Sequence, residues 1–483
     1  MNTRTSHPVV YEINTWVWLG ELSRHYGTTI NLGSVPQREW DALADLGIDA
    51  LWLMGVWERS PAGARIAIEN QGLVADFRRA LPDFSPADNV GSPYCIRSYH
   101  VDGHLGGPGG LMEARRRLTD RNIALILDFV PNHAAPDHAW VSEHPEYFIQ
   151  GDVEDVRNDP GSFRQVGSRF FACGRDPHYP AWPDVLQLNV FQAATRQALT
   201  ETVLDVAGQC DGVRCDMAML AMNPVFARTW GSRAGPEPVR EFWPGLIHAV
   251  RRRHPDFLFM AEAYWDLEWP LQQQGFDFCY DKRLYDRLDH GNAEGVRMHL
   301  CAERVYQDKL VRFIENHDEP RAASAFPGQK SLAAAVAMAT IPGARLFHEG
   351  QFEGKQIRLP VFLGRRPAEP VDPEVRGFYK RLLRILKSEG LRNGQWRLCE
   401  RVPPVDAAGG EAIVAWCWSK DAERHLIIVN LSGREARGQV RWPRDEPYSG
   451  LWSDLFNGKV LEIGHDGLSV DLPAWGFHFL KGL

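Results

Sequence analysis

The sequence lacks the features that mark secreted, membrane-spanning and nucleic-acid-binding proteins. Its first segment, Met1 to Pro8, is polar and has no apolar core like that of a signal peptide, and no apolar run is as long as a membrane span. The 54 basic residues are outnumbered by 62 acidic ones, so the formal net charge is −8. This charge does not favour binding to nucleic acid or to an anionic membrane. We therefore expect a cytoplasmic protein with neither kind of partner, and nothing in the sequence favours one oligomeric state.

Paired cysteines and phosphate-binding glycines are also lacking. The eight cysteines are spread singly and form no Cys-x-x-Cys pair, which favours reduced thiols over a disulfide framework. The glycines of residues 103–110 do not follow a strand in G-x-G-x-x-G order, so they give little support for a nucleotide site. We find no internal repeat. The sequence therefore points to an ordinary globular chain, long enough for two or three domains.

What the sequence does contain is an alternation of apolar strands and amphipathic helices. Helical spacing is expected over 37–46, 111–121, 193–207, 238–253 and 331–339. The strands are apolar on both faces, as in a buried parallel sheet. Eight strands alternating with helices predict an α/β fold with a (β/α)₈ barrel. The predicted strands cover 9–13, 50–57, 123–130, 211–217, 257–263, 276–280, 310–316 and 344–347.

Two regions break this alternation. Residues 134–188 are rich in Asp, Pro, Gly and aromatics without a clear period, which predicts a small inserted subdomain after strand 3. Residues 84–110 also read as loop. From 389 onward, short alternating strands predict a C-terminal antiparallel β-sandwich. We therefore expect a barrel formed by 1–133 and 189–388, an inserted domain at 134–188, and a β-sandwich at 389–483.

Polar residues follow several of the predicted barrel strands, where the chemistry of such barrels is found. Alternation places Arg214 and Asp216 on one face of their strand, and a cation beside Asp216 suits an ionised nucleophile. Glu262 lies in an apolar, aromatic stretch, where desolvation would raise its pKa as an acid requires. Asp318 could bind sugar hydroxyls more tightly in the transition state. Two carboxylates that flank a scissile bond are what glycoside hydrolysis needs.

Four short motifs at the strand ends resemble the conserved regions of the α-amylase superfamily, glycoside hydrolase family 13. They are Asp128-Phe-Val-Pro-Asn-His133, Gly212-Val-Arg-Cys-Asp216, Ala261-Glu-Ala263 and Glu315-Asn-His-Asp318. Their order and spacing fit the family, and they cover the barrel from Tyr11 to Gly350. The inserted and terminal domains also lie where the family carries its domains B and C.

The resemblance implies a role for each of these residues. Asp216 would be the nucleophile, Glu262 the general acid/base and Asp318 the stabiliser of the transition state. The expected substrate is an oligosaccharide or another glycoside, cleaved with retention through a covalent glycosyl-enzyme. The substrate-binding set implied by the family pattern is Tyr94, which resembles the stacking aromatic of the cleavage subsite, with Asp128, His133, Arg214 and His317.

The sequence departs from the calcium-dependent members of the family after the nucleophile. Where those enzymes often carry Lys-His, this chain has Met217-Ala-Met-Leu-Ala-Met222. Asn132 matches a calcium-contacting position, but one oxygen is far fewer than the six to eight that calcium prefers. We therefore expect no metal and no cofactor, and calcium stays an alternative that the region after Asp216 does not support. The methionines could form a soft wall for a non-sugar aglycone, or they could simply pack in the core.

Several alternatives stay open at this point. The same three carboxylates serve transglycosylases, glucanotransferases and isomerases, and a non-catalytic sugar-binding relative is the more distant rival, although none of the three is lost. Cys215 adjoins Asp216 but faces the opposite side of the strand, so we interpret it as packing. Other residues near the strand ends are candidates for substrate contacts or for ordinary packing and surface roles: Trp57, Arg59, His100, His104, Trp140, Trp182 and Arg321.

Overall fold

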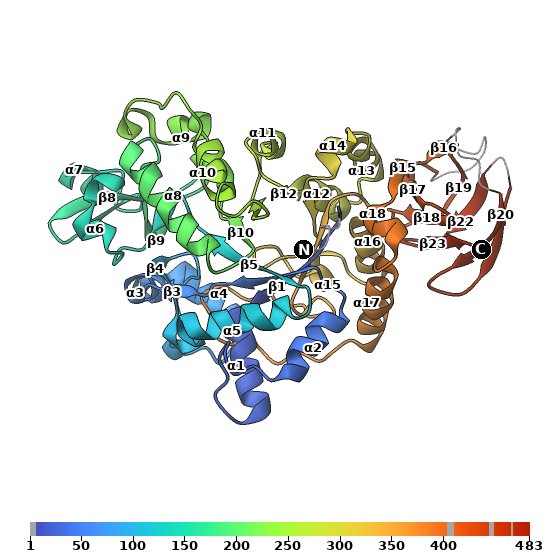
Figure 1. The fold of residues 1–483 in the computed structure, drawn as a ribbon, viewed down its shortest axis with the longest axis horizontal. Coiled ribbons are helices and arrows are strands. Elements are labelled where there is room, and N and C mark those ends of the chain that lie inside the picture. Colours follow the sequence, from blue (N-terminus) through green and yellow to red (C-terminus); the bar gives the residue numbers. More distant parts are fainter. Residues whose placement is uncertain (1–5, 403–409, 444–448, 465–466) are drawn as a thin grey trace.

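The protein is described here by a computed structural model that covers residues 6–402, 410–443, 449–464 and 467–483. Eight parallel strands close into a barrel in the middle of the molecule, which confirms the predicted fold (Figure 1). Around the barrel the strands are β1 (Val9–Asn14), β14 (Ala344–His348), β13 (Leu310–Arg312), β12 (Phe278–Tyr280), β11 (Leu258–Ala261), β10 (Gly212–Cys215), β5 (Ala124–Phe129) and β2 (Ala50–Met54).

The barrel strands are buried on both faces because helices surround them. β2 has the sequence Ala-Leu-Trp-Leu-Met and is buried throughout. The predicted helices are all present, with bounds that shift by a few residues: α2 (Gln37–Asp45), α5 (Gly107–Thr119), α8 (Ala193–Ala207), α10 (Phe242–Arg251) and α16 (Gln329–Thr340). Further helices outside the inserted region are α1 (Thr15–Tyr26), α3 (Pro61–Glu69), α4 (Gln71–Ala80), α9 (Asn223–Trp230), α11 (Glu268–Gln273), α12 (Lys282–Asp289), α13 (Ala293–Leu300), α14 (Arg304–Gln307), α15 (Ala322–Ala325), α17 (Pro373–Leu386) and α18 (Glu389–Asn393).

The register of the strands brings the polar side chains together at one end of the barrel. Arg214 on β10 is the partner of Asp128 on β5, and Cys215 is the partner of Ala261 on β11. Asp216 and Glu262 therefore leave adjacent strands at the same level. The carboxyl ends of the strands form the edge at which the candidate site lies.

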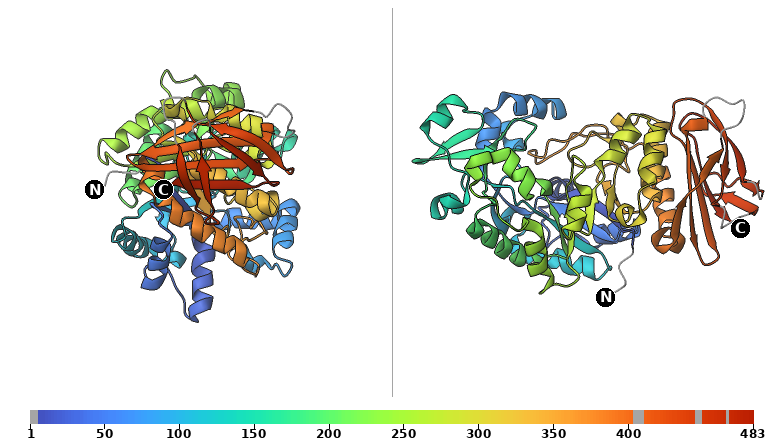
Figure 2. Two further views of the ribbon diagram at one scale, coloured as in Figure 1. Left: turned by 90° about the vertical axis from the view of Figure 1, so that its right-hand side faces the viewer. Right: turned by 90° about the horizontal axis from the view of Figure 1, so that it is seen from above.

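Residues between β5 and β10 form a small antiparallel sheet, in the order β6-β9-β8-β7. Its elements are β6 (His133–Ala134), α6 (Trp140–Glu143), α7 (Val153–Asn158), β7 (Phe163–Val166), β8 (Arg169–Gly174) and β9 (Trp182–Gln187). Figure 2 shows this sheet and the C-terminal strands at opposite ends of the long axis, with the barrel between them. The sheet agrees with an inserted unit after the third barrel strand, while the residue boundaries of the three domains stay predictions.

The expectation that 84–110 is loop is wrong in two places. β4 (Ile96–Val101) pairs antiparallel with β3 (Trp57–Arg59), and α5 begins at Gly107, four residues before the predicted start. The pairing of β3 and β4 contains two register shifts, which explains why no clean alternation marks these short strands in the sequence.

The C-terminal region consists of two antiparallel sheets, as predicted. The larger has the order β15-β17-β18-β23-β20-β21 and the smaller β16-β19-β22. Indole nitrogens of Trp416 and Trp418 on β17 donate to the hydroxyl and the carbonyl of Thr340, so the larger sheet packs against α16. The strands are β15 (Gln395–Leu398), β16 (Glu400–Val402), β17 (Ile413–Lys420), β18 (Glu423–Asn430), β19 (Ala436–Arg441), β20 (Gly450–Asp454), β21 (Val460–Ile463), β22 (Leu468–Leu472) and β23 (Phe477–Gly482).

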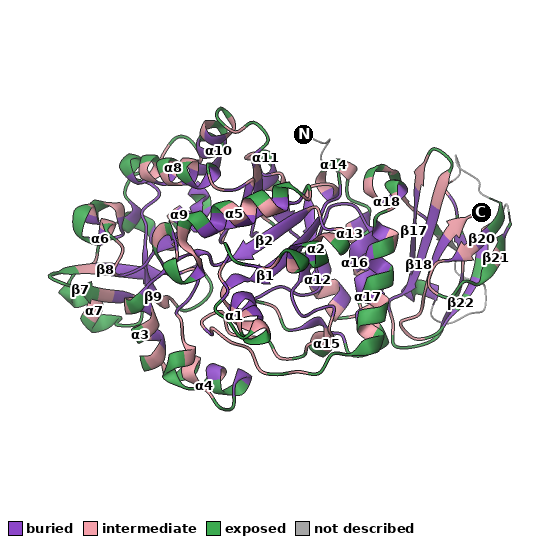
Figure 3. Cartoon of the chain, turned by 60° about the horizontal axis from the view of Figure 1, so that its bottom comes forward, coloured by how far each residue is buried: buried purple, intermediate pink, exposed green. Residues whose placement is uncertain are grey.

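The barrel strands and two strands of the larger C-terminal sheet are largely buried. Figure 3 shows the barrel strands and β17 and β18 as buried, whereas the outer faces of α4 and α7 are exposed. All eight cysteines are free thiols, seven of them buried. Across the described residues, no helix combines the length and the apolarity that a bilayer span requires. The first five residues of the polar N-terminal segment lie outside the described residues.

Candidate active site

Arg214 lies between two carboxylates, Asp216 and Glu262. Its Nη1 donates to Oδ1 of Asp216 over 2.6 Å, and its Nη2 is 2.8 Å from Oε2 of Glu262. The Arg214 side chain is fully buried, and the two carboxylates are nearly so. The predicted placement of Arg214 and Asp216 on one face is therefore confirmed, and one guanidinium holds both carboxylates together. We call Arg214, Asp216 and Glu262 the Arg214 arm of the site.

Each oxygen of Glu262 has a fixed donor. The backbone N–H of Met217 donates to Oε2 over 2.6 Å, and the Tyr264 hydroxyl donates to Oε1 over 2.9 Å. Burial raises the pKa of Glu262, Arg214 opposes this, and the charges of Asp216 and Asp318 add to the rise, which leaves a pKa of about 7. This confirms the direction expected from the aromatic surroundings. Near neutral pH, Glu262 can hold a proton or release it.

The backbone contact to Glu262 depends on an unusual conformation. Met217 has a φ of 42°, in the left-handed region that residues with a side chain seldom adopt. This conformation turns the chain from β10 into a short 3-10 helix over Ala218–Ala221. A strained backbone conformation persists only where surrounding contacts hold it in place. Here the hydrogen bond from the Met217 N–H to Glu262 is such a contact.

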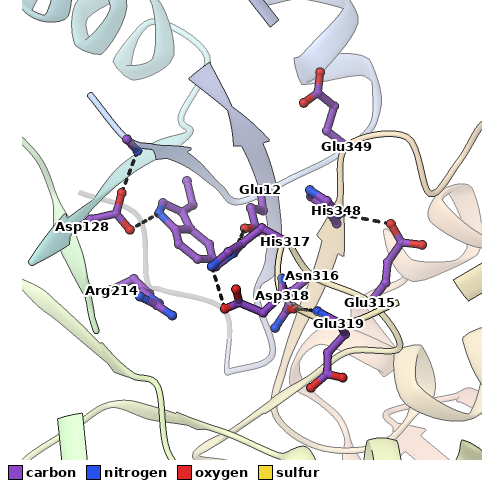
Figure 4. Close-up of polar contacts among 12 residues, drawn as sticks. Glu12, Asp128, Arg214, Glu315, Asn316, His317, Asp318, Glu319, His348 and Glu349 are labelled. Atoms are coloured by element: carbon purple, nitrogen blue, oxygen red, sulfur yellow. Dashed lines mark hydrogen bonds and ion pairs between the residues drawn. The ribbon is translucent and has the colours of Figure 1, made fainter. Parts of the chain in front are cut away.

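His317 also lies between two carboxylates. Its Nδ1 bonds to Oε1 of Glu12 on β1, and its Nε2 is 2.8 Å from Oδ2 of Asp318 (Figure 4). The Tyr94 hydroxyl is 2.7 Å from the same Nε2. Glu12 and His317 are buried, whereas the Asp318 side chain is 46% exposed at the mouth of the barrel. We call Glu12, His317 and Asp318 the His317 arm.

The charges of the His317 arm stabilise one another. Burial lowers the pKa of His317, but Asp318 and Glu12 more than offset it, and the net pKa is well above the usual value. Burial raises the pKa of Asp318, and His317 outweighs it with help from Arg214, so that the pKa is about 2. Asp318 is therefore ionised throughout the neutral range, unlike Glu262.

Aromatic rings enclose the guanidinium of Arg214. Its central carbon lies 5.3 Å from the ring of Trp52, 5.2 Å from that of Tyr94 and 5.7 Å from that of Tyr280. Because cation–π contacts strengthen when water is excluded, these rings help to keep a fully buried cation in place. Tyr94 contacts both arms, and its position at the cleavage subsite stays a prediction.

Asp128 lies on the neighbouring strand, and both of its oxygens are occupied by the protein. Oδ1 accepts from the Trp52 indole over 3.1 Å, and Oδ2 accepts from the Gly55 N–H over 2.8 Å (Figure 4). Burial raises its pKa to about 6 against the opposing effect of Arg214. Asp128 thus anchors the floor of the site, and its contact with substrate stays a prediction.

His133 lies at the start of the inserted sheet and is buried. Its ring centre is 5.4 Å from that of Trp182, and the Asn132 amide nitrogen is 3.3 Å from its Nδ1. Burial lowers the pKa of His133, and Asp216 partly opposes the fall. A largely neutral imidazole next to the nucleophile candidate could bind a sugar hydroxyl, which also stays a prediction.

Three candidates for substrate contacts have structural roles instead. Trp57 is fully buried and its indole donates to the carbonyl of Asp128 over 2.8 Å. Arg321 is buried in an ion pair with Glu315. Arg59 is buried and donates to the Gly91 carbonyl over 2.8 Å. Because both arginines are buried, neither forms a surface ion pair.

The remaining candidates contact other rings or loop residues. The His104 ring stacks on Trp16 with centroids 4.4 Å apart, and the Trp140 ring packs against His138 at 4.7 Å. The exposed His100 contacts the Ser98 hydroxyl. Trp182 stays a candidate because it is half-buried beside His133.

The methionine segment after Asp216 is mostly core. Met219 and Met222 are buried, and only Met217 is partly exposed next to Glu262. Packing therefore accounts for the segment better than a long apolar wall for an aglycone. Cys215 is fully buried among apolar neighbours, as expected.

The residues near Asn132 do not fit a calcium site. Its Oδ1 accepts from the Gln187 amide over 3.0 Å, so the one oxygen that matches a calcium ligand already has a partner. Among the described residues, no group of three or more His, Cys, Asp or Glu side chains is arranged to hold a metal ion.

Comparison with known proteins identifies the barrel. Residues 38–275 match the family described as alpha amylase, catalytic domain. This segment resembles an α-amylase catalytic domain. The match confirms the resemblance to the α-amylase superfamily and includes the motifs at 128–133, 212–216 and 261–263, whereas the motif at 315–318 lies beyond it. The crystal structure of the noncanonic maltogenic alpha-amylase AmyB from Thermotoga neapolitana shares the fold, with a TM-score of 0.71, 18% identity and full coverage of both chains.

Relatives of known function include both amylases and transferases. The alpha-amylase MalA of Haloarcula japonica is 25% identical over 364 residues, which cover 72% of this chain and 44% of MalA. The alpha-1,4-glucan:maltose-1-phosphate maltosyltransferase of Burkholderia pseudomallei is 30% identical over 204 residues, 40% of this chain and 15% of that protein. The chain thus spans less than half of the length of these relatives.

Sequence reasoning missed three groups that hold the site together. They are Glu12, the hydroxyl of Tyr264 and the backbone N–H of Met217. Only Glu12 left a signal, because it is a charged residue inside the apolar strand Val-Val-Tyr-Glu-Ile. Such a residue in a buried strand needs a partner.

Proposed function

We propose that the protein is a retaining α-glycoside hydrolase that acts on α-glucosides or α-glucans. The observation that carries this proposal is the Arg214 arm, in which one guanidinium contacts both Asp216 and Glu262. Retaining glycosidases need their two carboxyl groups close together, at about 5–5.5 Å, whereas inverting enzymes separate them to admit a water molecule. Carboxylates that share one arginine suit the retaining arrangement.

In the first half-reaction, Asp216 attacks the anomeric carbon while Glu262 protonates the departing oxygen. The proton of Glu262 belongs on Oε1, because Oε2 accepts the Met217 N–H and faces Arg214. The Tyr264 hydroxyl contacts Oε1 and can orient that proton. The bond from the anomeric carbon to the leaving oxygen breaks, and a β-linked ester to Asp216 forms.

In the second half-reaction, Glu262 is ionised and takes a proton from an incoming water. The water oxygen displaces Asp216, so two inversions restore the α configuration. The pKa of about 7 suits Glu262 to both tasks. Asp318, kept ionised by His317, is placed at the mouth to accept hydrogen bonds from sugar hydroxyls as positive charge develops on the ring.

Transfer to a sugar acceptor is the second candidate function. It is favoured by the similarity to a maltosyltransferase that is 30% identical over 204 residues. The chemistry is the same until the second half-reaction, in which an acceptor hydroxyl replaces water. The distinction therefore depends on what occupies the acceptor side, next to Glu262.

A product analysis tests both candidates. The protein is incubated with maltose, maltooligosaccharides, isomaltose, sucrose, trehalose and starch, and products are followed by chromatography and NMR. Free sugar that is released first as the α-anomer supports a retaining hydrolase, whereas longer or rearranged saccharides support the transferase. An initially β-configured product would contradict retention, and no action on any α-glycoside would contradict both candidates.

A further inference from the structure

Glu12 is a carboxylate in the interior of the barrel. It lies on β1 among Val9, Val10 and Ile13, and its side chain is completely buried. Its Oε1 bonds to His317, and its Oε2 is buried without a hydrogen-bond partner. Burying an ionised carboxylate costs several kcal/mol unless a cation or donors compensate. Within the described part of the chain, the cation paired with Glu12 is His317.

The two nitrogens of His317 face different carboxylates. Nδ1 contacts Glu12, and Nε2 contacts Asp318 over 2.8 Å and the Tyr94 hydroxyl over 2.7 Å. A neutral imidazole carries one N–H, so it would point a lone pair at one of the two carboxylates. Both contacts are favourable only when His317 carries two protons.

We propose that Glu12 is a positioning residue that holds His317 as an imidazolium and aims its Nε2–H at Asp318 and at the sugar bound there. The proposal rests on the proposed function, because it assigns Asp318 to the cleavage subsite. With Nδ1–H fixed by Glu12, the Nε2–H lies in a constant direction. A sugar hydroxyl that enters between His317 and Asp318 then meets a charged donor on one side and a carboxylate on the other.

Other charged and titratable groups around His317 bear on its protonation. Burial lowers the pKa of His317, and the charges of Asp318 and Glu12 raise it. Arg214 lies across the Tyr94 ring, and the neighbouring His348 on β14 has a pKa well below its usual value, so it adds no positive charge at neutral pH. The titratable and charged groups around His317 are Glu12 from β1, Asp128 from β5, Arg214 from β10, His348 from β14 and Asp318 from a loop (Figure 4). The Tyr94 hydroxyl also contacts its Nε2.

The substitution Glu12→Gln removes the negative charge at this position and keeps a side chain of nearly the same shape. A glutamine oxygen can still accept from Nδ1, but the negative charge is gone, so the pKa of His317 should fall. In [¹⁵N]histidine NMR, with the His317 signals assigned from a His317→Gln sample, we expect wild-type His317 to stay doubly protonated well above the pH at which a free histidine titrates. In Glu12→Gln we expect it to titrate at a lower pH than in the wild type. The matched control is Glu319→Gln, which neutralises a nearby carboxylate that pairs with Lys282 and leaves His317 unchanged.

Kinetics provide the second readout. For Glu12→Gln, the ratio of variant to wild-type kcat/KM should be lower at pH 8 than at pH 6. The ratio should fall about tenfold for each pH unit above the lowered pKa of His317, because the charged form declines by that factor there. Glu12→Asp, which restores the charge, should recover part of this loss. A role in stability alone would lower kcat/KM equally at both pH values and would count against the proposal.

The NMR titration decides the matter without substrate. A neutral His317 at pH 7 in the wild type would overturn the proposal, even if Glu12→Gln does not fold. An unchanged His317 pKa in a folded Glu12→Gln protein would overturn it as well. An enzyme inactive on every α-glycoside would contradict the proposed function instead, and the titration would still report on Glu12 and His317.

Discussion

The two arms of the site share one plan, in which a cation lies between two carboxylates. Arg214 joins Asp216 and Glu262, and His317 joins Glu12 and Asp318. The cations differ in kind, because a guanidinium keeps its proton at every working pH whereas an imidazole does so only while its neighbours require it. In the Arg214 arm the cation is therefore constant and a carboxyl titrates near neutrality. In the His317 arm, Asp318 stays ionised and the positive charge of His317 depends on Glu12.

The arms also differ in how they meet the solvent. Every side chain of the Arg214 arm is buried, while the His317 arm ends in the half-exposed Asp318. Covalent chemistry benefits from a dry site in which charges are held in place, and recognition of hydroxyls benefits from a carboxylate that an entering sugar can contact. We therefore expect the Arg214 arm to make and break the glycosidic bond and the His317 arm to recognise the substrate.

The largest effect is expected from Asp216→Asn. An amide cannot form the glycosyl ester, so kcat should fall by about 10⁴-fold or more, the scale on which loss of a covalent nucleophile acts. Circular dichroism should show an intact fold. The control is Asp471→Asn, which removes a largely exposed partner of Arg437 in the C-terminal sheet and should leave kcat unchanged. Full activity in Asp216→Asn would remove the Arg214 arm from the chemistry.

Glu262→Gln should have the next largest effect. Loss of a general acid typically costs about 10²–10⁴-fold in rate, and less when the leaving group needs no proton. In the wild type, activity should decline as the pH rises through about 7, because the protonated form of Glu262 is lost. With an aryl glycoside that has a good leaving group, the variant should lack this decline. If the decline persists, another group is the acid.

The sequence could predict the pairing of Arg214 with Asp216 because the two residues are close in the sequence. Arg214 and Asp216 are two residues apart, and the period of a strand places them on one face. Glu12 could not be paired with His317 in the same way, because the two residues are 305 positions apart and only closure of the barrel brings them together. The Met217 N–H contact depends on a left-handed backbone that tertiary packing enforces. The inserted sheet was predicted as a unit, but its short irregular strands carry too little periodicity to locate.

Replacing Arg214 should change both the free energy of unfolding and the pKa of Glu262. Arg214→Met would leave Asp216 and Glu262 buried without their cation, and the free energy of unfolding should fall by about 3–5 kcal/mol. Because Arg214 lowers the pKa of Glu262, the pKa should rise above about 7 in this variant. Urea denaturation measures the first effect, and infrared difference spectra of the carboxyl group measure the second. Arg214→Lys, which keeps a charge but contacts fewer oxygens, should lie between Arg214→Met and the wild type, and an unchanged Glu262 pKa in both variants would contradict the account.

The smallest effect is expected behind the Arg214 arm, at Cys215. Its side chain packs on the opposite face of β10 and is fully buried. Cys215→Ala should lower the free energy of unfolding by about 1–2 kcal/mol, as for other small core truncations, and should leave kcat/KM within about twofold. Thermal unfolding and a standard rate assay are sufficient. A large loss of kcat without loss of stability would mean that this face also takes part in the reaction.

In the proposed mechanism, Asp216 forms a covalent bond to the sugar while Glu262 moves the proton. The most direct measurement uses Glu262→Gln with an α-glucosyl fluoride, a substrate whose leaving group needs little protonation, so that the glycosyl-enzyme forms but is released slowly for lack of a base. Peptide mass spectrometry of the acid-quenched protein should then find one hexosyl group, attached to Asp216. An adduct on a different residue, or complete turnover of the fluoride with a β-configured product and no adduct, would contradict the account.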